Sequence, residues 1–493
     1  MTDVLLTHSY FLRFDTKEYR AMMPYPPLGT LIAANVLRNA GMMVAHHDVM
    51  FSSREDEIEE AIERFRPKMV VIYDDSFNYL TKMCLSRMRE AAFRLASYAK
   101  AAGCVTVVFS SDAVDHLEQY FAHSVDYVIC GEAERTLTEL ATHVLGRATA
   151  SHPESVPGLS FLKDGAVVRT PPRGLMKDLD VLPFPAWDLV DISRYRSAWK
   201  RRHGYFSINL STTRGCPFHC NWCAKPLFGQ AYTSRSPEHV VEEMKFLKET
   251  IRPDHLWITD DIFGLKRGWI ERFSQIVNRE DAVIPFKCLS RVDLLLKDNT
   301  IRHLADAGCR TVWVGAESGS QKILDAMEKG TTVEEIRAAT RLLHSAGIRV
   351  GFFLQFGYPG EIREDIQLTL DLVRECMPDE IGVSVSYPLP GTKFYERVKK
   401  GLRSKQNWFS SQDLDLMFPG EYHPDFYRSL HKVLHKKFSV WRGMRMLTEF
   451  LRPSLRRTNG RSFRSLAGMF YHGATLPFAL QKLESYQKTS SSP

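Results

Sequence analysis

The sequence predicts an α/β protein with two successive sets of parallel strands and a helical C-terminal region. Short apolar runs alternate with amphipathic helical stretches near the N-terminus, and the same alternation resumes at about residue 201. With 493 residues, the chain is too long for one ordinary hydrophobic core. We therefore expect four regions, with boundaries at 1–145, 146–200, 201–400 and 401–493.

The first 145 residues contain five short apolar runs, each followed by a helical pattern. The runs lie in "DVLLTH", "MVAHHDVM", "KMVVIYDD", "CVTVVFSSD" and "VDYVICGE". Strands of a parallel sheet that is covered by helices on both faces have this apolar character. The pattern therefore predicts a flavodoxin-like, or Rossmann-like, domain.

The ligand of such a domain is expected outside the carboxyl ends of its strands. No GxGxxG motif stands in the first turn, so a dinucleotide is not the expected ligand. The loops that should face a ligand are residues 8–29, 74–78, 110–112 and 131–134.

Residues 146–200 are predicted to form a structured connector, because they contain proline-rich and hairpin-like segments, including "GLSFLKDGAVVRTPPR". Six strand patterns follow, and after each comes a segment with a helical pattern. They are "FSINLSTTRGC", "HLWITDD", "FKCLSRVD", "TVWVGAES", "VGFFLQFG" and "IGVSVSYP". Six such units predict a partial (β/α)6 barrel rather than eight closed units.

Three cysteines follow the first strand pattern of this barrel. Cys216, Cys220 and Cys223 are separated by three and two residues in "TTRGCPFHCNWCAKP". A structural zinc site needs four ligands, and neither the adjacent His219 nor the isolated cysteines elsewhere supply the fourth. A 4Fe-4S cluster, in contrast, can be held by three thiolates with one iron left open. The spacing therefore favours an iron-sulfur cluster over zinc.

The motif CxxxCxxC, with Trp222 before the last cysteine and in the loop after the first barrel strand, resembles the radical SAM superfamily. The resemblance covers residues 201 to about 400. It implies that the open iron binds S-adenosylmethionine (SAM) and that an electron from the cluster cleaves SAM to methionine and a 5'-deoxyadenosyl radical. A low-potential electron donor is then required.

The same resemblance implies further SAM-binding positions. Asp260 and Asp261 in "ITDDIF" would face the amino group of SAM, and Arg291 in "SRVD" its carboxylate. In "GAESGSQ", Glu317 would bind the ribose hydroxyls and Ser318 the carboxylate end, while residues 355–357, beginning at Gln355, would approach the adenosine. Polar residues at strand ends also cap helices, and this structural interpretation stays open.

A flavodoxin-like domain ahead of a radical SAM barrel resembles the cobalamin-binding radical SAM proteins. The segments that carry this likeness are "PYPPLGTLIAANVLRNAG" and "VDYVICGEAERTLTEL". The DxHxxG motif, whose histidine ligates cobalt in many cobalamin domains, is absent, and "HHDVM" has its residue types in another order. Either cobalamin binds without a histidine below cobalt, or the domain has lost the cofactor.

Three functions are consistent with these features. The first is a cobalamin-dependent radical SAM enzyme, most simply a C-methyltransferase that acts on an unactivated carbon of a small molecule. The second is an oxidation or ring closure, because the family also resembles the anaerobic magnesium-protoporphyrin monomethyl ester cyclase. The third is a module that binds the cluster or cobalamin without catalysis. No residue stands out as a hydrogen donor to a substrate radical.

The net charge of +7 is concentrated in the C-terminal region. From residue 401 onward, 15 Lys and Arg stand against 6 Asp and Glu. The sequence has no secretory signal and no apolar run long enough to span a bilayer, and we expect a cytoplasmic protein with reduced cysteines. Nucleic acid is not an expected partner.

The C-terminal region also contains an apolar stripe at helical spacing among basic residues. Its members are Leu430, Val433, Leu434, Phe438 and Trp441. Such a stripe is typical of a packing face between domains, and also of a helix that rests on anionic lipid. Peripheral membrane contact would favour a hydrophobic substrate, such as a lipid, an isoprenoid or a tetrapyrrole.

Overall fold

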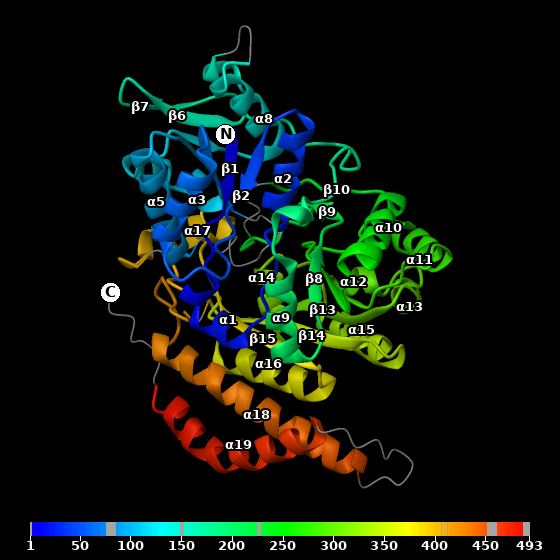
Figure 1. The fold of residues 1–493 in the computed structure, drawn as a ribbon. Coiled ribbons are helices and arrows are strands. Elements are labelled where there is room, and N and C mark those ends of the chain that lie inside the picture. The colour runs from blue at the N-terminus through cyan, green and yellow to red at the C-terminus, as the bar shows by residue number, and fades with distance from the viewer. Residues whose placement is uncertain are drawn as a thin grey trace.

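The computed structural model describes residues 2–74, 85–147, 152–223, 228–405, 407–411, 413–450 and 461–486. It has two large sheets; in the view of Figure 1 the first lies above the barrel sheet, and a helical hairpin lies at the bottom. The expected fold, a flavodoxin-like domain followed by a six-stranded partial barrel and C-terminal helices, is confirmed.

The first sheet has the strand order β2-β1-β3-β4-β5-β6-β7. Strands β1 to β5 are parallel, and their residues are mostly buried because helices cover both faces. The strands are β1 (Val4–Thr7), β2 (Val44–His46), β3 (Met69–Tyr73), β4 (Val105–Phe109), β5 (Tyr127–Ile129), β6 (Leu159–Lys163) and β7 (Ala166–Arg169).

Helices α2 and α8 cover one face of this sheet, and α3, α5 and α7 cover the other. The short α1 and α6 lie in the loops at its carboxyl edge. The helices are α1 (Thr16–Ala21), α2 (Leu28–Asn39), α3 (Ile58–Phe65), α5 (Ser86–Ala101), α6 (Ser111–Asp115), α7 (Leu117–Ala122) and α8 (Ala133–Val144).

The region that was expected to be a connector adds two strands to the first sheet. β6 pairs antiparallel with β5, and β7 pairs antiparallel with β6. The segment with the hairpin pattern therefore forms β6 and β7, which extend the first sheet beyond residue 145. After it, α9 (Ile192–His203) leads into the barrel.

The barrel sheet has the order β15-β14-β13-β12-β11-β8, with all neighbours parallel. Each strand pattern of the sequence forms one of its strands. They are β8 (Ser207–Leu210), β11 (His255–Ile258), β12 (Phe286–Ser290), β13 (Cys309–Glu317), β14 (Arg349–Phe356) and β15 (Glu380–Val385).

Side chains cap the starts of some barrel helices. Ser236 caps α10 ahead of a proline at its first position, and Thr332 forms a capping box with Glu335 at the start of α15. The helices are α10 (Pro237–Phe246), α11 (Trp269–Arg279), α12 (Val292–Leu295), α13 (Thr300–Asp306), α14 (Gln321–Ala326), α15 (Val333–Ser345), α16 (Arg363–Cys376) and α17 (Lys393–Val398).

One hydrophobic core runs from the first domain into the barrel. The segment between α1 and α2 packs against α9 and the first barrel strands: the Tyr25 ring lies 5.2 Å from that of Trp199 and 4.8 Å from that of Trp257. Trp199 Nε1 donates to the Pro24 carbonyl (2.7 Å), and Asn209 Nδ2 donates to the Pro26 carbonyl (2.9 Å). The barrel wall is therefore completed by residues of the first domain.

The C-terminal region forms a hairpin of α18 (Pro424–Phe450) and α19 (Arg461–Glu484), and α18 packs on α16. Four residues of the predicted apolar stripe, Leu430, Val433, Leu434 and Phe438, are buried, and Trp441 is partly buried against the core. The stripe on α18 is therefore a packing face. Among the described residues, no helix is both long enough and apolar enough to cross a bilayer.

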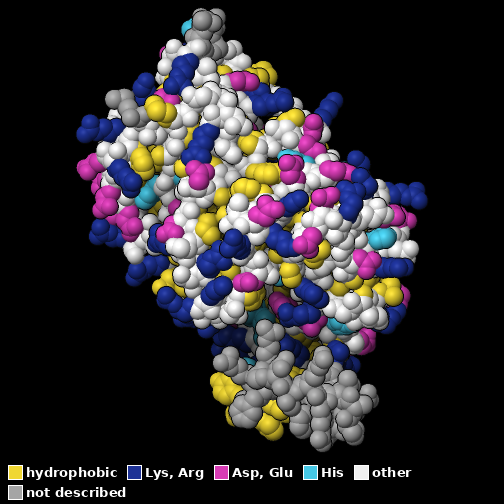
Figure 2. All heavy atoms as spheres, turned by 45° about the vertical axis from the view of Figure 1, so that its right-hand side comes forward, with side chains coloured by type: hydrophobic (Ala, Val, Ile, Leu, Met, Phe, Trp, Pro, Cys, Tyr) yellow, Lys and Arg dark blue, Asp and Glu magenta, His cyan; other side chains and the backbone are white. Residues whose placement is uncertain are grey.

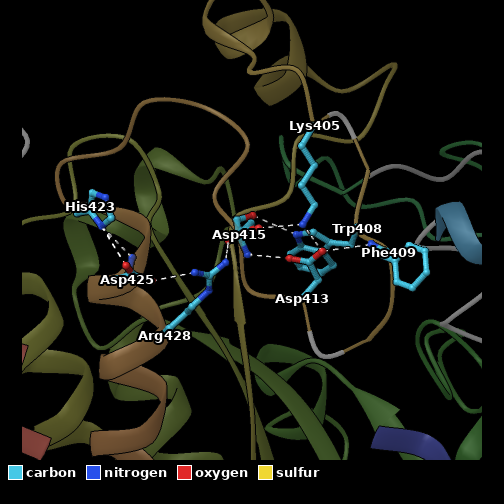
Figure 3. Close-up of polar contacts among 8 residues, drawn as sticks. All are labelled: Lys405, Trp408, Phe409, Asp413, Asp415, His423, Asp425 and Arg428. Carbon is cyan, nitrogen blue, oxygen red and sulfur yellow. Dashed lines mark hydrogen bonds and ion pairs between the residues drawn. The ribbon is translucent and has the colours of Figure 1, made fainter. Parts of the chain in front are cut away.

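The loop ahead of α18 is fastened by the ion pairs drawn in Figure 3. Asp415 accepts hydrogen bonds from Lys405 Nζ (2.8 Å) and from Arg428 of α18, and Asp413 also pairs with Lys405. Trp408 Nε1 donates to the carbonyl of Asp415 (3.1 Å). The loop and the first turns of α18 are thus held together by charge.

The same loop contacts the first domain. Ser411 Oγ donates to Asp15 Oδ1 (2.7 Å), and Ser86 N donates to the Trp408 carbonyl (3.0 Å). The Trp408 ring also packs on Tyr387, two residues after β15, at a centroid distance of 4.4 Å. The loop therefore bridges the first domain and the last barrel strand.

Candidate functional site

The cysteine loop begins and ends at a short antiparallel ribbon. β9 (Thr213–Arg214) pairs with β10 (Thr233–Ser234), so residues 215–232 leave and return at the same place. Gly215 follows β9 with φ of 75°, and a Cβ there would collide with the Ala231 carbonyl oxygen. The glycine ahead of the first cysteine is therefore required by the geometry of the loop base.

Asp260, two residues after β11, holds this base on the barrel side. Its carboxylate accepts hydrogen bonds from Thr212 N (2.7 Å), Thr213 N (3.0 Å) and Thr212 Oγ1. Burial raises the pKa of Asp260 to about 6. Asp260 is thus engaged with the backbone of the loop base, whereas its neighbour Asp261 is exposed.

Asn221 anchors the middle of the cysteine loop. Its backbone N donates to the Met327 carbonyl (3.0 Å) and its Nδ2 to the Ala326 carbonyl (2.7 Å). The Tyr358 hydroxyl donates to Asn221 Oδ1 (3.0 Å). Sequence reasoning missed Asn221 and Tyr358, because an amide between two cysteines resembles a spacer and its partners lie more than 100 residues away.

Two cations lie close to Cys220. Arg291 Nη1 is 4.0 Å from Cys220 Sγ, and the guanidinium stacks on the Phe218 ring at 3.7 Å. Lys329 is buried and pairs with Glu317 at 2.9 Å; burial lowers its pKa, but Glu317 and Cys220 outweigh this and hold the pKa above its usual value. The thiolate is the form of cysteine that binds metal, and a metal-bound thiolate at this position would lie beside positive charge.

The three cysteines are each half-buried, and none of the described cysteines forms a disulfide. Within the described ranges, no three His, Cys, Asp or Glu side chains are arranged to hold a metal ion. Residues 224–227, just after Cys223, lie outside those ranges. The assignment of Cys216, Cys220 and Cys223 as cluster ligands therefore stays a prediction.

The remaining predicted SAM-binding residues fall into two groups. Arg291 and Glu317 lie beside the cysteine loop, and Glu317 has a left-handed backbone (φ 57°) at an irregularity in β13. Ser318 and Gln355 are buried: the Ser318 hydroxyl lies 3.1 Å from Thr369 Oγ1, and Gln355 Nε2 donates to Ser386 Oγ (2.9 Å). The roles of all of these residues toward SAM stay predictions.

At the carboxyl edge of the first sheet, His8 is engaged in a buried chain of polar contacts. His8 Nε2 lies 3.2 Å from Asp48 Oδ1, and the Tyr195 hydroxyl donates to Asp48 Oδ2 (2.8 Å). Burial raises the pKa of Asp48, but the hydrogen bond with His8 and the nearby imidazoles bring it below its usual range. His46, for its part, has its pKa lowered to about 4 by burial.

Other polar groups at this edge are buried without a partner among the described residues. They include Thr7 Oγ1, at the end of β1, and Nε2 of His46 and of His47. Buried polar atoms are normally satisfied, so this edge is suited to a ligand with hydrogen-bonding groups. Of the predicted loop 74–78, only Asp74 is described; it accepts from Ser9 N (2.8 Å).

Residues 210–373 match the family model described as the Radical SAM superfamily. The barrel is a radical SAM domain. The predicted resemblance is thus confirmed for the part of the chain that contains the cysteine motif. The radical SAM domain supplies the loop base, the three cysteines, Arg291 and Glu317.

Proteins with similar sequences include two that are named as methyltransferases and one that is named as a cyclase. The chain is 28% identical over 403 residues to an uncharacterized methyltransferase of Pyrococcus horikoshii, covering 79% of this chain and 82% of the relative. It is 27% identical over 403 residues to bacteriochlorophyllide d C-8(2)-methyltransferase of Chlorobaculum tepidum, covering 78% and 82%. The anaerobic magnesium-protoporphyrin IX monomethyl ester cyclase of Rubrivivax gelatinosus is 27% identical over 282 residues, covering 56% and 49%.

Two solved structures share the fold. One is the radical S-adenosylmethionine methyltransferase TsrM from Kitasatospora setae, determined with cobalamin and a [4Fe-4S] cluster, with a TM-score of 0.64 and 21% identity over 82% of this chain and 80% of that one. The other is the cobalamin-dependent S-adenosylmethionine radical enzyme OxsB, with a TM-score of 0.71 and 15% identity over 97% and 72%. Both likenesses cover more than four fifths of this chain.

Glu361, behind the turn at Gly357, generates a prediction about pH. Its Oε2 accepts from Gly357 N (2.6 Å), its Oε1 has no partner among the described residues, and burial raises the pKa to about 8. Because this pKa is above the ordinary value, the folded state keeps a proton that the unfolded chain loses, and stability falls as pH rises from about 4.5 to 8. Glu361→Gln stays neutral and should avoid this loss.

The free energy of unfolding of the metal-free protein, measured by urea denaturation, should therefore favour Glu361→Gln increasingly between about pH 5 and pH 8. The change should be a few kcal/mol, at about 1.4 kcal/mol for each pH unit. Glu364→Gln, an exposed change three residues along the chain in the first turn of α16, serves as the control. An unchanged difference between wild type and Glu361→Gln at the two pH values would contradict the buried proton.

Proposed function

We propose that the protein is a cobalamin-dependent radical SAM enzyme that transfers a methyl group to an unactivated carbon of a small molecule. The observation that carries the proposal is the placement of the cysteine loop. The loop starts at the carboxyl ends of the barrel strands, and its base is bound to the first domain through Arg214. The strand ends of the first domain contain buried polar groups without a partner among the described residues. A cluster and a cobalamin bound at these two edges would face one another.

The residues of the loop suit the proposed cluster. Cys216, Cys220 and Cys223 would hold three irons, and the Arg291 guanidinium beside Cys220 would lie next to the negatively charged sulfur of the bound cluster. The bound cluster and SAM would supply the carbon radical, after a low-potential donor has delivered an electron. Asp261 would face the amino group of SAM, and Glu317 and Arg291 its ribose and carboxylate.

The first domain suits a cobalamin without a protein ligand below cobalt. The imidazole of His8 already faces Asp48, and His46 Nδ1 lies 3.3 Å from the Leu189 carbonyl oxygen. The unpartnered groups near the strand ends would then bind the periphery of the cofactor.

Methyl transfer is favoured over the cyclase alternative because the alignments cover a larger share of the methyltransferases than of the cyclase. The methyltransferases are matched over 82% of their own length, and the Rubrivivax gelatinosus cyclase over 49%. The similarity to the proteins named as methyltransferases thus extends over most of both chains. A binding module without catalysis, the third candidate, would cleave no SAM.

The cluster is tested by reconstitution without oxygen. The protein should contain about four irons, and Cys216→Ala, Cys220→Ala and Cys223→Ala should each abolish reductive SAM cleavage, because each removes one of three thiolates. Cys288→Ala, a buried change in β12, is the matched control and should keep cleavage. One zinc per chain and no iron after reconstitution would exclude the cluster.

The reaction is tested with SAM that carries a deuterated methyl group. Anaerobic turnover on candidate substrates, with cobalamin present, should give a product that gains three deuterium atoms, detected by mass spectrometry. A product that has lost hydrogen and gained no deuterium would assign the protein to oxidation or ring closure. The full chain should be used, because residues 22–27 complete the barrel core.

We further propose a hydrophobic substrate that reaches the site from a membrane surface on which the C-terminal hairpin rests. The outer face of α19 carries Phe470, Tyr471 and Phe478 with exposed fractions of 71, 65 and 74%. Its inner face packs on α18, where Met469 lies against Gly443. Figure 2 shows apolar side chains on this protruding lobe, at the bottom of the view.

The charge of the hairpin complements an anionic lipid. Residues 424–486 contain twelve Lys and Arg against three Asp and Glu. Exposed aromatic residues together with surrounding positive charge are typical of helices that lie in the membrane interface, and each basic residue near anionic lipid contributes about 1 kcal/mol. A lipid, an isoprenoid or a tetrapyrrole is the class of substrate that such a surface would deliver.

Liposome flotation tests this contact. The wild type should float with anionic vesicles, more strongly at low salt than at physiological salt, and a Phe470→Ser, Phe478→Ser double variant should bind about tenfold more weakly or worse because two apolar anchors are lost. Phe409→Ser, an exposed phenylalanine outside the hairpin, is the control. Wild-type protein that stays at the bottom at both salt concentrations would contradict the proposal.

A further inference from the structure

A buried charge cluster joins the first domain to the base of the cysteine loop. Arg214, the last residue of β9, donates from Nη2 to Glu134 Oε1 (2.5 Å) and from Nη1 to Glu134 Oε2 (3.1 Å). Nη1 also lies 3.5 Å from Glu132 Oε1. All three side chains are 5% exposed or less. A bidentate guanidinium–carboxylate pair of this kind fixes both the distance and the orientation of its partners.

The cluster reaches functional positions on both sides of the domain boundary. On one side, Arg214 is followed by Gly215 and Cys216, and its guanidinium lies 5.2 Å from the ring of Phe228, on the returning branch of the same loop. On the other side, the hydroxyl of Tyr73, the last residue of β3, donates to Glu134 Oε1 (3.4 Å). The end of a strand in the first sheet is thus connected through two side chains to the start of the cysteine loop.

Packing alone does not account for buried charges at this place. Taking three charged groups out of water is costly, and apolar residues of similar size commonly stabilise an interface as well or better. A buried cluster of charges does, however, disfavour any other relative position of its partners, because displaced partners would leave charge uncompensated. The barrel, for its part, holds the ribbon β9–β10 through Asp260 and through Arg235 Nη1, which donates to the Ser211 carbonyl (2.9 Å).

We propose that Arg214, Glu132 and Glu134 form a latch that sets the position of the cysteine loop relative to the first domain. The three are positioning residues, since they act through the loop and not on the reacting atoms. What the latch aligns rests on the proposed function: it would hold SAM on the cluster at the distance and angle needed for methyl transfer to cobalamin. Loop fastening itself is a property of the protein without cofactors.

The fastening is tested by hydrogen exchange on the full-length, metal-free protein. Glu134→Gln keeps the shape of the side chain and removes the charge, so the amides of residues 214–223 and 228–234 should exchange at least fivefold faster, while those of β13 remain unchanged. Glu132→Gln, whose contact with Arg214 is longer, is a milder variant if Glu134→Gln fails to fold. Glu139→Gln is the matched control, because Glu139 lies on the same helix and pairs with Arg173 near the surface.

The alignment is tested by comparing two reactions of the reconstituted protein, with titanium(III) citrate as reductant. In one, the cluster donates an electron and SAM is cleaved to methionine and 5'-deoxyadenosine. In the other, the electron pair of cob(I)alamin attacks the SAM methyl group, a cobalt–carbon bond forms, and S-adenosylhomocysteine leaves with the electrons of the broken sulfur–carbon bond. In Glu134→Gln, the first rate should stay within about twofold of wild type and the second should fall at least tenfold.

The possible results separate the latch from the proposed function. Unchanged exchange in Glu134→Gln and Glu132→Gln would overturn the latch, and equal losses of both reactions would overturn its role in alignment. A wild type that cleaves no SAM and binds no cobalamin would refute the proposed function, while the exchange experiment would still test the latch.

Discussion

The candidate site depends on the closure of the cysteine loop by the ribbon β9–β10. Three thiols on eight consecutive residues have no fixed arrangement in a free loop, and the ribbon restricts them by bringing residues 214 and 233 together. The ribbon has only two residues on each side, too few to be stable alone. Its position is therefore set by the side chains that surround it.

Those side chains are carboxylates from two different domains. On the barrel side, Asp260 accepts hydrogen bonds from the backbone of the loop base, and on the other side Glu132 and Glu134 face Arg214. Inside a protein, such groups strongly favour the single arrangement in which every donor meets an acceptor. The position of the loop base therefore depends both on the folded barrel and on the docked first domain.

The hydrophobic core that the two domains share also fixes the first domain against the barrel. Residues of the segment between α1 and α2 lie against Trp199 and the first barrel strands, so the six-stranded barrel is open on a side that the first domain covers. A partial barrel exposes apolar surface that a closed one would bury. The first domain thus buries apolar surface that the partial barrel would otherwise expose.

Sequence reasoning found the parts of this arrangement that have a local signal. The strands have apolar runs of the right length, and the cysteine motif has a spacing that few other sites share, so both could be predicted. Asn221, Tyr358 and Arg214 could not, because each works through partners 80 or more residues away. Glu132 and Glu134 lie in loop 131–134, which the sequence predicted to face a ligand, but their pairing with Arg214 has no local signal. The hairpin β6–β7 was recognised, but its attachment to the first sheet depends on pairing with β5, which local text does not encode.

The C-terminal stripe shows how a correct periodicity leaves its partner undetermined. Leu430 and Val433 lie at helical spacing as predicted, yet the surface they meet is the protein's own core, while the exposed aromatic residues lie on the following helix. The loop ahead of α18 is in turn bound to the first domain through Ser411 and to α18 through Asp415. A displacement of α18 must therefore either break these contacts or carry the loop with it.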